Sequence, residues 1–258
     1  MKTSTPLLTS ILLLFLMLWA PLGQYEFLIE HWMKIGTYSI PFVGIGIFAF
    51  KDIGTNMSLG SNLRFLALIM LVAYFFHQFE EHWVDLFGNH YAFYSYNNNF
   101  ILSALGQPNA LVKPLTKESI FVINTSLVWL VGLLSLSRSP RHLFPFFAMA
   151  SIVLINGVVH IVGGMFKFRY NPGLFTSIVI FIPLYFWIIK QVRHRVTNFG
   201  MHVVLGLIWA FLAHVIMVAG LLFANWYKVI PEYLFWIALV FWSIIPMAIL
   251  RKDSIKIS

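Results

Sequence analysis

Residues 63–87 read LRFLALIMLVAYFFHQFEEHWVDLF and set the class of fold. Apart from Arg64 the first part is apolar, and the second part carries His77, Glu80, Glu81, His82 and Asp85. A helix needs about 20 mostly apolar residues to cross a bilayer. Ionisable groups within such a helix cost several kcal/mol unless they are paired, hydrated or bound to a metal. The stretch therefore predicts a membrane helix that carries a functional site.

The same apolar character extends over the whole chain. Of its 258 residues, 60% are apolar, 10% are charged and 17% are aromatic. Soluble globular chains carry about 25% charged and roughly 45–50% apolar residues. Disordered, coiled-coil and collagen-like chains need abundant charge or a regular glycine period. Because cysteine is absent, disulfides, thiolate nucleophiles and Cys-ligated metals are excluded. The composition predicts an integral membrane protein.

Eight apolar runs are candidates for membrane helices. The alternating segments of about ten residues that are typical of outer-membrane barrels are not found. We expect an all-α, polytopic transmembrane helix bundle in one domain, residues 1–258, with about eight spans. If the first or second run does not cross, the number is seven. The runs cover residues 7–21, 35–50, 63–87, 119–136, 143–164, 173–189, 201–224 and 231–250.

The first run could be a secretory signal, with Lys2 as its basic region. No small-x-small cleavage site precedes the polar stretch that follows, so we expect a retained helix. With eight spans and the N-terminus inside, most Lys and Arg residues fall in inner segments, which favours both termini in the cytoplasm. The Lys and Arg residues that give the net charge of +8 lie between apolar runs rather than on one face of a helix. The expected partner is therefore the lipid bilayer, not nucleic acid.

The longest connection between the runs is residues 88–118. It contains Asn97, Asn98 and Asn99 followed by Phe100, Ile101 and Leu102. Long loops in compact domains are usually lids, binding elements or disordered segments. The apolar cluster predicts a short helix at the membrane interface here.

The third run offers an imidazole flanked by two carboxylates. At about 100° per residue, Glu81 lies about 40° from His77 on the helix surface and Glu80 about 60° to the other side. His82 points roughly 140° away and is expected elsewhere. Asp85 could extend the reactive face, but the wet end of the helix is the favoured place for it.

The fifth and sixth runs add further polar groups. Asn156 and His160 are four residues apart and share a helix face. Pro172 and Gly173 then break the chain and begin the sixth run with free amide groups, which favour an anion or a developing oxyanion. Tyr170 and Thr176 flank this turn, where they either position a substrate or satisfy the backbone.

A depth estimate connects these groups. At about 1.5 Å per residue, His77 lies about 20 Å from Arg64, and His160 about 25 Å from His142. His214 lies about 20 Å from Met201 by the same arithmetic. The third, fifth and seventh runs all cross from inside to outside in the expected topology. The three histidines are therefore expected at one level of the membrane, with the carboxylates and the Pro-Gly turn at or just above it.

His77-x-x-Glu80-Glu81, Asn156-x-x-x-His160 and Pro172-Gly173, in that order, resemble the HXXEE family of small multi-pass membrane proteins. The resemblance covers about residues 63–183. The family is functionally uncharacterised, so the resemblance implies which residues matter and not what they do. It adds nothing about His214, which is a candidate from its depth alone.

The main hypothesis is a metal site with His77, Glu81 and His160 as ligands. Glu80 would then be an acid/base or a second carboxylate ligand. Zinc in catalytic sites takes three protein ligands plus water, from His nitrogens and carboxylates. Two His and one carboxylate also suit non-haem iron, so the divalent metal is zinc or iron. The ring nitrogens of the two histidines must then lie within roughly 5 Å of each other. We expect a metal-dependent membrane enzyme, a hydrolase rather than an oxidase, that acts on a lipid-like substrate.

Two alternatives use the same groups. The first resembles the glutamate intramembrane peptidases. Glu80 or Glu81 would activate water with the help of His160, while Asn156 and His214 would stabilise the oxyanion. That family has an Arg four residues after the Glu pair, where this chain has Asp85. The second alternative is a transporter or a proton or ion pathway, for which intramembrane Glu and His are typical relay groups.

Overall fold

The computed structural model of the chain describes residues 5–23, 25–49, 59–138 and 142–249. Within these ranges the secondary structure is helical, apart from one isolated antiparallel bridge between Val84 and His90. The predicted all-α class is confirmed. The first three helices are α1 (Thr5–Gly23), α2 (Glu26–Ala49) and α3 (Leu59–His82). The predicted short helix within the long connection is α4 (Ala92–Ala104).

The remaining helices follow the predicted runs, and three of them contain a π-helical segment. The first rod consists of α5 (Lys117–Asn124), η1 (Thr125–Leu130) and α6 (Val131–Arg138), and it is followed by α7 (Phe144–Lys167). The next rod consists of α8 (Leu174–Thr176), η2 (Ser177–Phe181) and α9 (Ile182–Val192). The last two are α10 (Phe199–Gly220) with η3 (Leu221–Trp226), and α11 (Glu232–Ile244) with η4 (Ile245–Met247). The π segments are η1, η2 and η3.

Five helical rods in the described ranges are long and apolar enough to cross a membrane. They cover Asn62–His82, Lys117–Ser137, Phe144–Lys167, Leu174–Val192 and Phe199–Trp226. Within the first and last predicted runs, the described apolar stretches are Ile11–Pro21, which is part of α1, and Glu232–Met247. The second run belongs to α2, which begins at Glu26 rather than near residue 35. The fold is thus a multi-helix bundle of membrane character, and the five helices of membrane length found among the described residues do not confirm the count of about eight spans.

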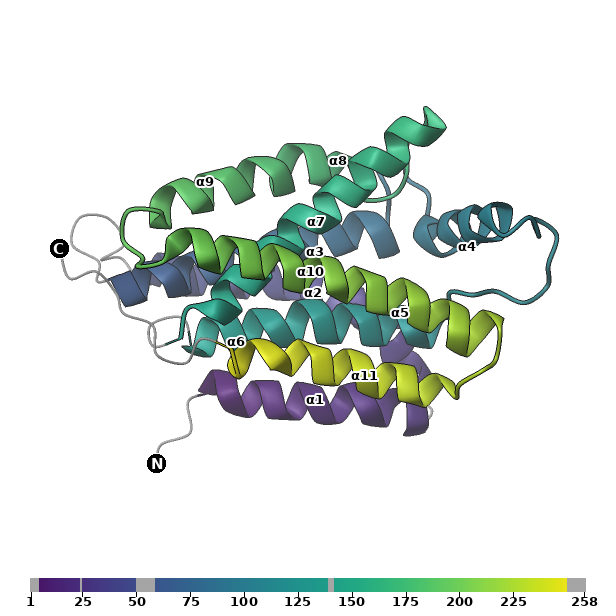
Figure 1. Cartoon of the computed structure of the whole chain (residues 1–258), viewed down its shortest axis with the longest axis horizontal. Coiled ribbons are helices and arrows are strands. Elements are labelled where there is room, and N and C mark those ends of the chain that lie inside the picture. The colour runs from purple at the N-terminus through teal and green to yellow at the C-terminus, as the bar shows by residue number, and fades with distance from the viewer. Residues whose placement is uncertain (1–4, 24, 50–58, 139–141, 250–258) are drawn as a thin grey trace.

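The bundle is organised around α7, which packs against α10, α6, α9 and α3 (Figure 1). Phe144, Phe146 and Phe147 at the start of α7 are fully or almost fully buried in the core. In contrast, α9 and α10 expose large apolar side chains such as Phe186 and Phe211. A membrane protein can expose such side chains because lipid covers them.

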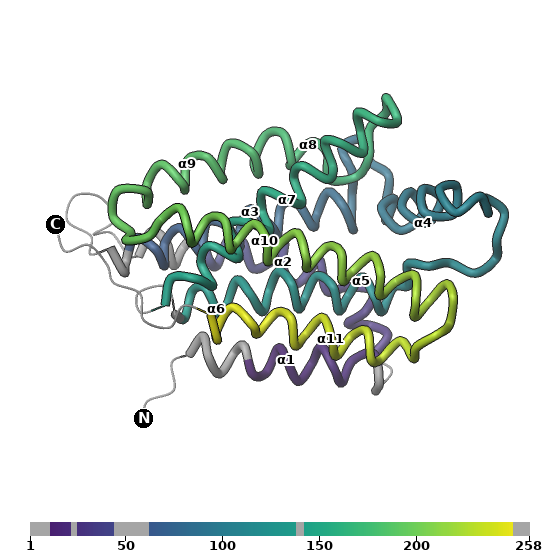
Figure 2. The backbone as a smooth tube through the Cα atoms, in the orientation of Figure 1, coloured from purple at the N-terminus to yellow at the C-terminus, as the bar shows by residue number. Residues whose placement is uncertain are grey.

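The two ends of the bundle differ (Figures 1 and 2). The start of α1, the end of η4 and the turn between α9 and α10 lie at one end. The opposite end holds α4, the connection from α4 to α5, and the turn between η3 and α11. Because α3 runs toward this second end, its polar C-terminal part lies there, close to α8.

Helix α3 ends at His82, whereas the sequence predicted that it continues to Phe87. Asp85 explains the difference. Its Oδ1 atom accepts hydrogen bonds from the backbone N–H groups of Phe87 and Asn89, at 2.9 and 2.8 Å. An Asp side chain that binds the backbone two residues on favours a turn over a helix. Asp85 therefore closes the loop after α3 and does not extend the helix, and, since it is buried, it does not lie at a wet helix end as expected.

Candidate functional site

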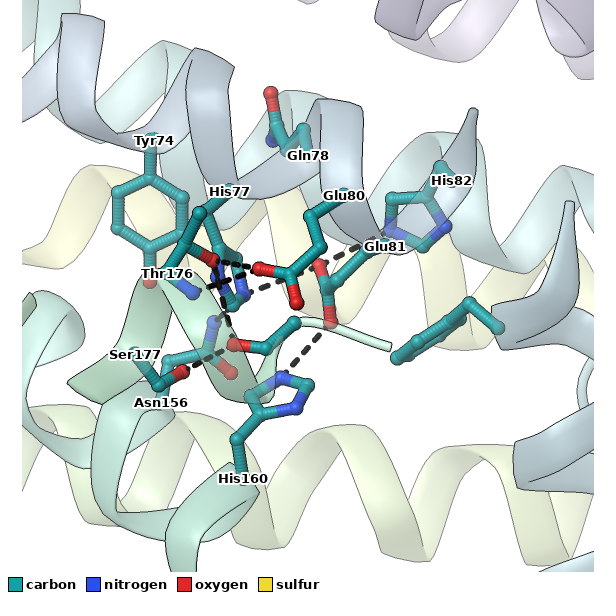
Figure 3. Close-up of polar contacts among 12 residues, drawn as sticks. Tyr74, His77, Gln78, Glu80, Glu81, His82, Asn156, His160, Thr176 and Ser177 are labelled. Atoms are coloured by element: carbon teal, nitrogen blue, oxygen red, sulfur yellow. Dashed lines mark hydrogen bonds and ion pairs between the residues drawn. The ribbon is translucent and has the colours of Figure 1, made fainter. Parts of the chain in front are cut away.

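The face of α3 that carries His77 and Glu81 meets α7 and the turn before α8 (Figure 3). His77 is fully buried, while Glu81 and His160 are 5% and 7% exposed. The possible ligand atoms of these three residues all lie within 4.8 Å of one another. Nε2 of His160 lies 2.9 Å from Oε1 of Glu81, and Nε2 of His77 lies 3.3 Å from Oε2. The requirement of ring nitrogens within roughly 5 Å is met.

A hydrogen-bond chain fixes the orientation of His77. The hydroxyl of Thr176 donates its single proton to Oε2 of Glu80, at 2.5 Å. The same hydroxyl oxygen lies 2.7 Å from Nδ1 of His77 and must accept from it. Nδ1 therefore carries the proton, and the Nε2 lone pair of a neutral imidazole is directed into the site. There it accepts from Nδ2 of Asn156, at 2.9 Å.

His160 is oriented by Asn171 in the same way. Nδ2 of Asn171 donates to the backbone carbonyl of His160 at 2.9 Å, which identifies Oδ1 as the other end of the amide. That Oδ1 atom lies 2.7 Å from Nδ1 of His160, so Nδ1 donates to it. The Nε2 lone pair of a neutral His160 consequently faces Glu81.

The consequence is an excess of acceptors in a buried place. With both Nδ1 protons held elsewhere, a neutral His160 and Glu81 place two acceptor atoms 2.9 Å apart with no proton between them. Such a contact needs either an additional proton, on the imidazole or on the carboxyl group, or a metal ion. A tetrahedral ion with bonds of about 2.1 Å holds its ligand atoms about 3.4 Å apart. Nε2 of His77 lies 3.3 Å from one oxygen of Glu81, close to that value, and Nε2 of His160 lies 2.9 Å from the other oxygen.

Glu80 has a different environment from Glu81. Its carboxylate accepts from the backbone N–H groups of Phe175 and Thr176 at 3.0 and 2.7 Å, and from two hydroxyl groups. These are the Thr176 hydroxyl and that of Tyr170, which lies 2.8 Å away. Burial raises the pKa of Tyr170 well above its ordinary value, so the phenol keeps its proton and donates. The anion site predicted at the start of the sixth run is thus filled by Glu80 of the same chain.

Gly173 allows the chain to pass directly over the cluster. Its φ of +95° is a left-handed conformation, which favours glycine. A Cβ atom there would lie 2.7 Å from Cε1 of His160, 2.8 Å from Cε1 of His77 and 2.9 Å from Cγ of Glu81. Pro172, directly before it, is also buried. The Pro-Gly turn is therefore a close cover for the three candidate ligands.

His214 lies outside the cluster. Its Nδ1 is 2.8 Å from the backbone carbonyl of Ala210, one turn earlier in α10. Among the described residues, the group able to hold a metal consists of His77, Glu81 and His160 alone.

Two participants were missed by the sequence reasoning. Asn171 lies within the Tyr-Asn-Pro-Gly motif, but no role was assigned to it. His82, expected elsewhere, has its Nε2 atom 3.3 Å from Oε2 of Glu81. His82 directly follows Glu81 and is the last residue of α3.

A row of amides extends the site away from α8. The indole N–H of Trp129 donates to Oε1 of Gln78 at 2.9 Å. The amide nitrogen of Gln78, Nε2, donates in turn to Oδ1 of Asn124 at 3.0 Å. The Nδ2 atom of Asn124 then lies 3.3 Å from Nε2 of His82. Because an indole only donates, the row has one direction and ends with a donor to His82. These groups hold His82 in place.

The arrangement defines a multi-helix membrane protein with a buried His–Glu cluster. Comparison with protein families adds one finding. Residues 68–188 match the family described as "Protein of unknown function with HXXEE motif". The match covers slightly less than half of the chain, agrees with the resemblance seen over residues 63–183, and includes the whole cluster. No curated protein and no solved structure matches the chain.

Proposed function

We propose that the chain is a membrane-embedded, metal-dependent hydrolase whose divalent ion, zinc or iron, is held by His77, Glu81 and His160. The observation that carries the proposal is the convergence of two imidazole Nε2 atoms on one carboxylate, with both Nδ1 protons engaged elsewhere. Metal-binding histidines commonly donate their second N–H to an acceptor that fixes the ring. Thr176 and Asn171 are such acceptors.

The set of ligands fits catalysis better than a purely structural ion. Three protein ligands leave a position for water or substrate, as in catalytic zinc sites. When bound, the ion supplies a Lewis acid and lowers the pKa of a coordinated water. The side chains do the rest. Asn156, whose amide donates to Nε2 of His77, would be free to donate to a developing oxyanion if that nitrogen held an ion.

Glu80 has a positioning role in this proposal rather than the acid/base role expected from the sequence. Its two oxygens already accept four hydrogen bonds. Through Thr176 it determines which nitrogen of His77 is free. A lipid-like substrate fits the location, because the cluster lies at the end of the apolar span Asn62–His82.

The test is hydrolysis of a fluorogenic acyl ester by the purified protein in vesicles. We expect chelation to abolish hydrolysis, and zinc or iron to restore it. Glu81→Gln should remove activity together with bound metal, whereas His214→Ala should retain both. A wild-type protein that binds neither metal would overturn the proposal.

The two alternatives give other results with the same variants. For a glutamate peptidase, cleavage survives chelation and is lost in Glu80→Gln or Glu81→Gln without a change in metal content. For a transporter or ion pathway, vesicles show solute or proton flux that the same substitutions remove. Either pattern would replace the metal-dependent hydrolase.

A further inference from the structure

A cavity of about 350 Å³ lies between α2, α4, the start of α5 and the end of α3. Its apolar wall includes Trp32 and Ile120. Its polar wall includes Lys117, Tyr94 and Ser95, together with one carboxylate, Glu30. Small-molecule sites occupy about 300–1,000 Å³ and combine an apolar lining with a few polar groups. The cavity lies at the lower end of this range. It is large enough for a short-chain molecule.

The cavity and the proposed metal site share a wall. His82 lines the cavity, and its Nε2 atom lies 3.3 Å from Oε2 of Glu81. Phe93 of α4 lies beside His82. The centroid of its ring is 4.5 Å from that of His82 and 6.4 Å from that of His160. A molecule in the cavity is therefore separated from the cluster by these two side chains.

The polar lining is rich in hydrogen-bond donors. Lys117 is paired with Glu30 at 2.6 Å, yet it has further N–H groups, and both side chains remain partly exposed. Tyr94 and Ser95 add hydroxyl groups. His31 also lines the cavity, and its buried Nδ1 atom has no hydrogen-bond partner among the described residues. Such a lining complements a ligand that accepts hydrogen bonds.

We propose that this cavity binds a short-chain acyl compound, with its apolar chain against Trp32 and Ile120 and its carbonyl or carboxylate head among the donors. That this compound is a substrate rests on the proposed function. That the cavity binds it does not depend on that function. The reaction that follows is hydrolysis, in which water adds to the acyl carbon, the acyl–oxygen bond breaks, and a carboxylic acid and an alcohol leave. Passage to the cluster requires Phe93 to move.

The experiment uses the absence of cysteine from the chain. Ser95→Cys places a thiol in the cavity wall, and Ser103→Cys places one on the same helix, outside the residues that line the cavity. Each folded protein is modified with a benzyl methanethiosulfonate, and the unmodified protein is its own reference. Hexanoate binding is measured by titration calorimetry on chelator-treated protein, with hexylammonium as the control of opposite charge.

We expect saturable binding of hexanoate that weakens at least tenfold when Ser95→Cys is modified and stays unchanged when Ser103→Cys is modified. Hexylammonium should bind at least tenfold more weakly. Equal loss in both modified proteins, no loss in either, or equal binding of the two probes would overturn the proposal.

A second arm separates this inference from the proposed function. In metal-loaded protein, modified Ser95→Cys should lose hydrolysis of a hexanoyl ester and keep its metal. If it hydrolyses the ester at the unmodified rate, the cavity is not the substrate site. If the wild-type protein binds no metal, the proposed function fails, and the calorimetry on metal-free protein still decides whether the cavity binds an acyl compound.

Discussion

At the residue scale, Thr176 is the group whose removal most directly tests how His77 is oriented. Its hydroxyl connects Nδ1 of His77 to Glu80 over 2.7 and 2.5 Å. Thr176→Val keeps the shape and removes the acceptor. Loss of a residue that orients a metal-binding His typically costs 10–100-fold in metal affinity. We expect a loss of that size in a competition titration with a chromophoric chelator.

Two further variants give this prediction its controls. Thr176→Ser restores the hydroxyl and should restore the affinity. Thr125→Val removes another buried hydroxyl, which donates to the Phe121 carbonyl within its own helix at 2.7 Å, and should leave metal affinity unchanged. An unchanged affinity in Thr176→Val would mean that Thr176 does not orient the ring.

Gly173 gives a second prediction at this scale. Gly173→Ala and Gly88→Ala both place a Cβ on a left-handed backbone, at φ +95° and +80°. That conformation costs about 1–2 kcal/mol in each. Only at Gly173 would the new Cβ also collide with the cluster, since nothing lies within 4 Å of the position at Gly88. Thermal melting should show a larger loss of stability for Gly173→Ala, together with a loss of metal binding that Gly88→Ala lacks. Equal behaviour would contradict the close cover described above.

The sequence allowed His77, Glu81 and His160 to be grouped because helical spacing gives the faces and depth gives the level. It did not reveal how Glu80 is used. The anion site at the start of α8 and the carboxylate that fills it come from different helices, and their contact depends on how α3 and α8 meet. Asn171 was missed for a similar reason, because its contact with His160 crosses the turn after α7.

At the element scale, Asn98 attaches α4 to the segment before α5. Its Nδ2 donates to the Leu115 carbonyl at 3.0 Å, and its Oδ1 accepts from the Leu115 N–H at 2.9 Å. Asn98→Ala leaves both buried backbone groups unpaired, which costs about 1–3 kcal/mol for each. We expect amide hydrogen exchange in α4 and in residues 105–116 to be at least tenfold faster.

The neighbouring residue supplies the control for α4. Among the hydrogen bonds of the described residues, the Nδ2 atom of Asn97 donates only to the backbone carbonyl of Phe93, in the same helix, at 3.2 Å. Asn97→Ala should therefore exchange at the wild-type rate in the same region. If the two variants exchange alike, Asn98 does not fix α4 in place.

Apolar periodicity in the sequence predicts where the helices lie, but it does not predict the residues at which they begin and end. Each of the eight apolar runs corresponds to a helix or to a rod of consecutive helices. The start of α2 was missed because Glu26, Glu30, His31 and Lys34 interrupt the apolar pattern, although a helix can present polar residues at the end of a bundle. The end of α3 was missed because the turn formed by Asp85 is a local hydrogen-bonding effect.

At the scale of the whole molecule, the orientation in the membrane remains a prediction from the basic residues. We expect the connection from α4 to α5 to lie outside the cell and the turn between α9 and α10 to lie inside. In the cysteine-free chain, Asn109→Cys and Arg195→Cys place single thiols in these two exposed segments. A membrane-impermeant maleimide on intact cells should label Asn109→Cys, and should label Arg195→Cys only after permeabilisation. The opposite pattern would invert the topology.

The metal content of the purified protein tests the central claim most directly. We expect about one equivalent of zinc or iron per wild-type chain after loading and desalting, because three ligands converge in one buried place. His77→Ala, Glu81→Gln and His160→Ala should each lose it, while His214→Ala should retain it. A wild-type protein that keeps no metal, or retention of metal by all three ligand variants, would contradict the account and leave the cluster as a protonated His–Glu ion pair.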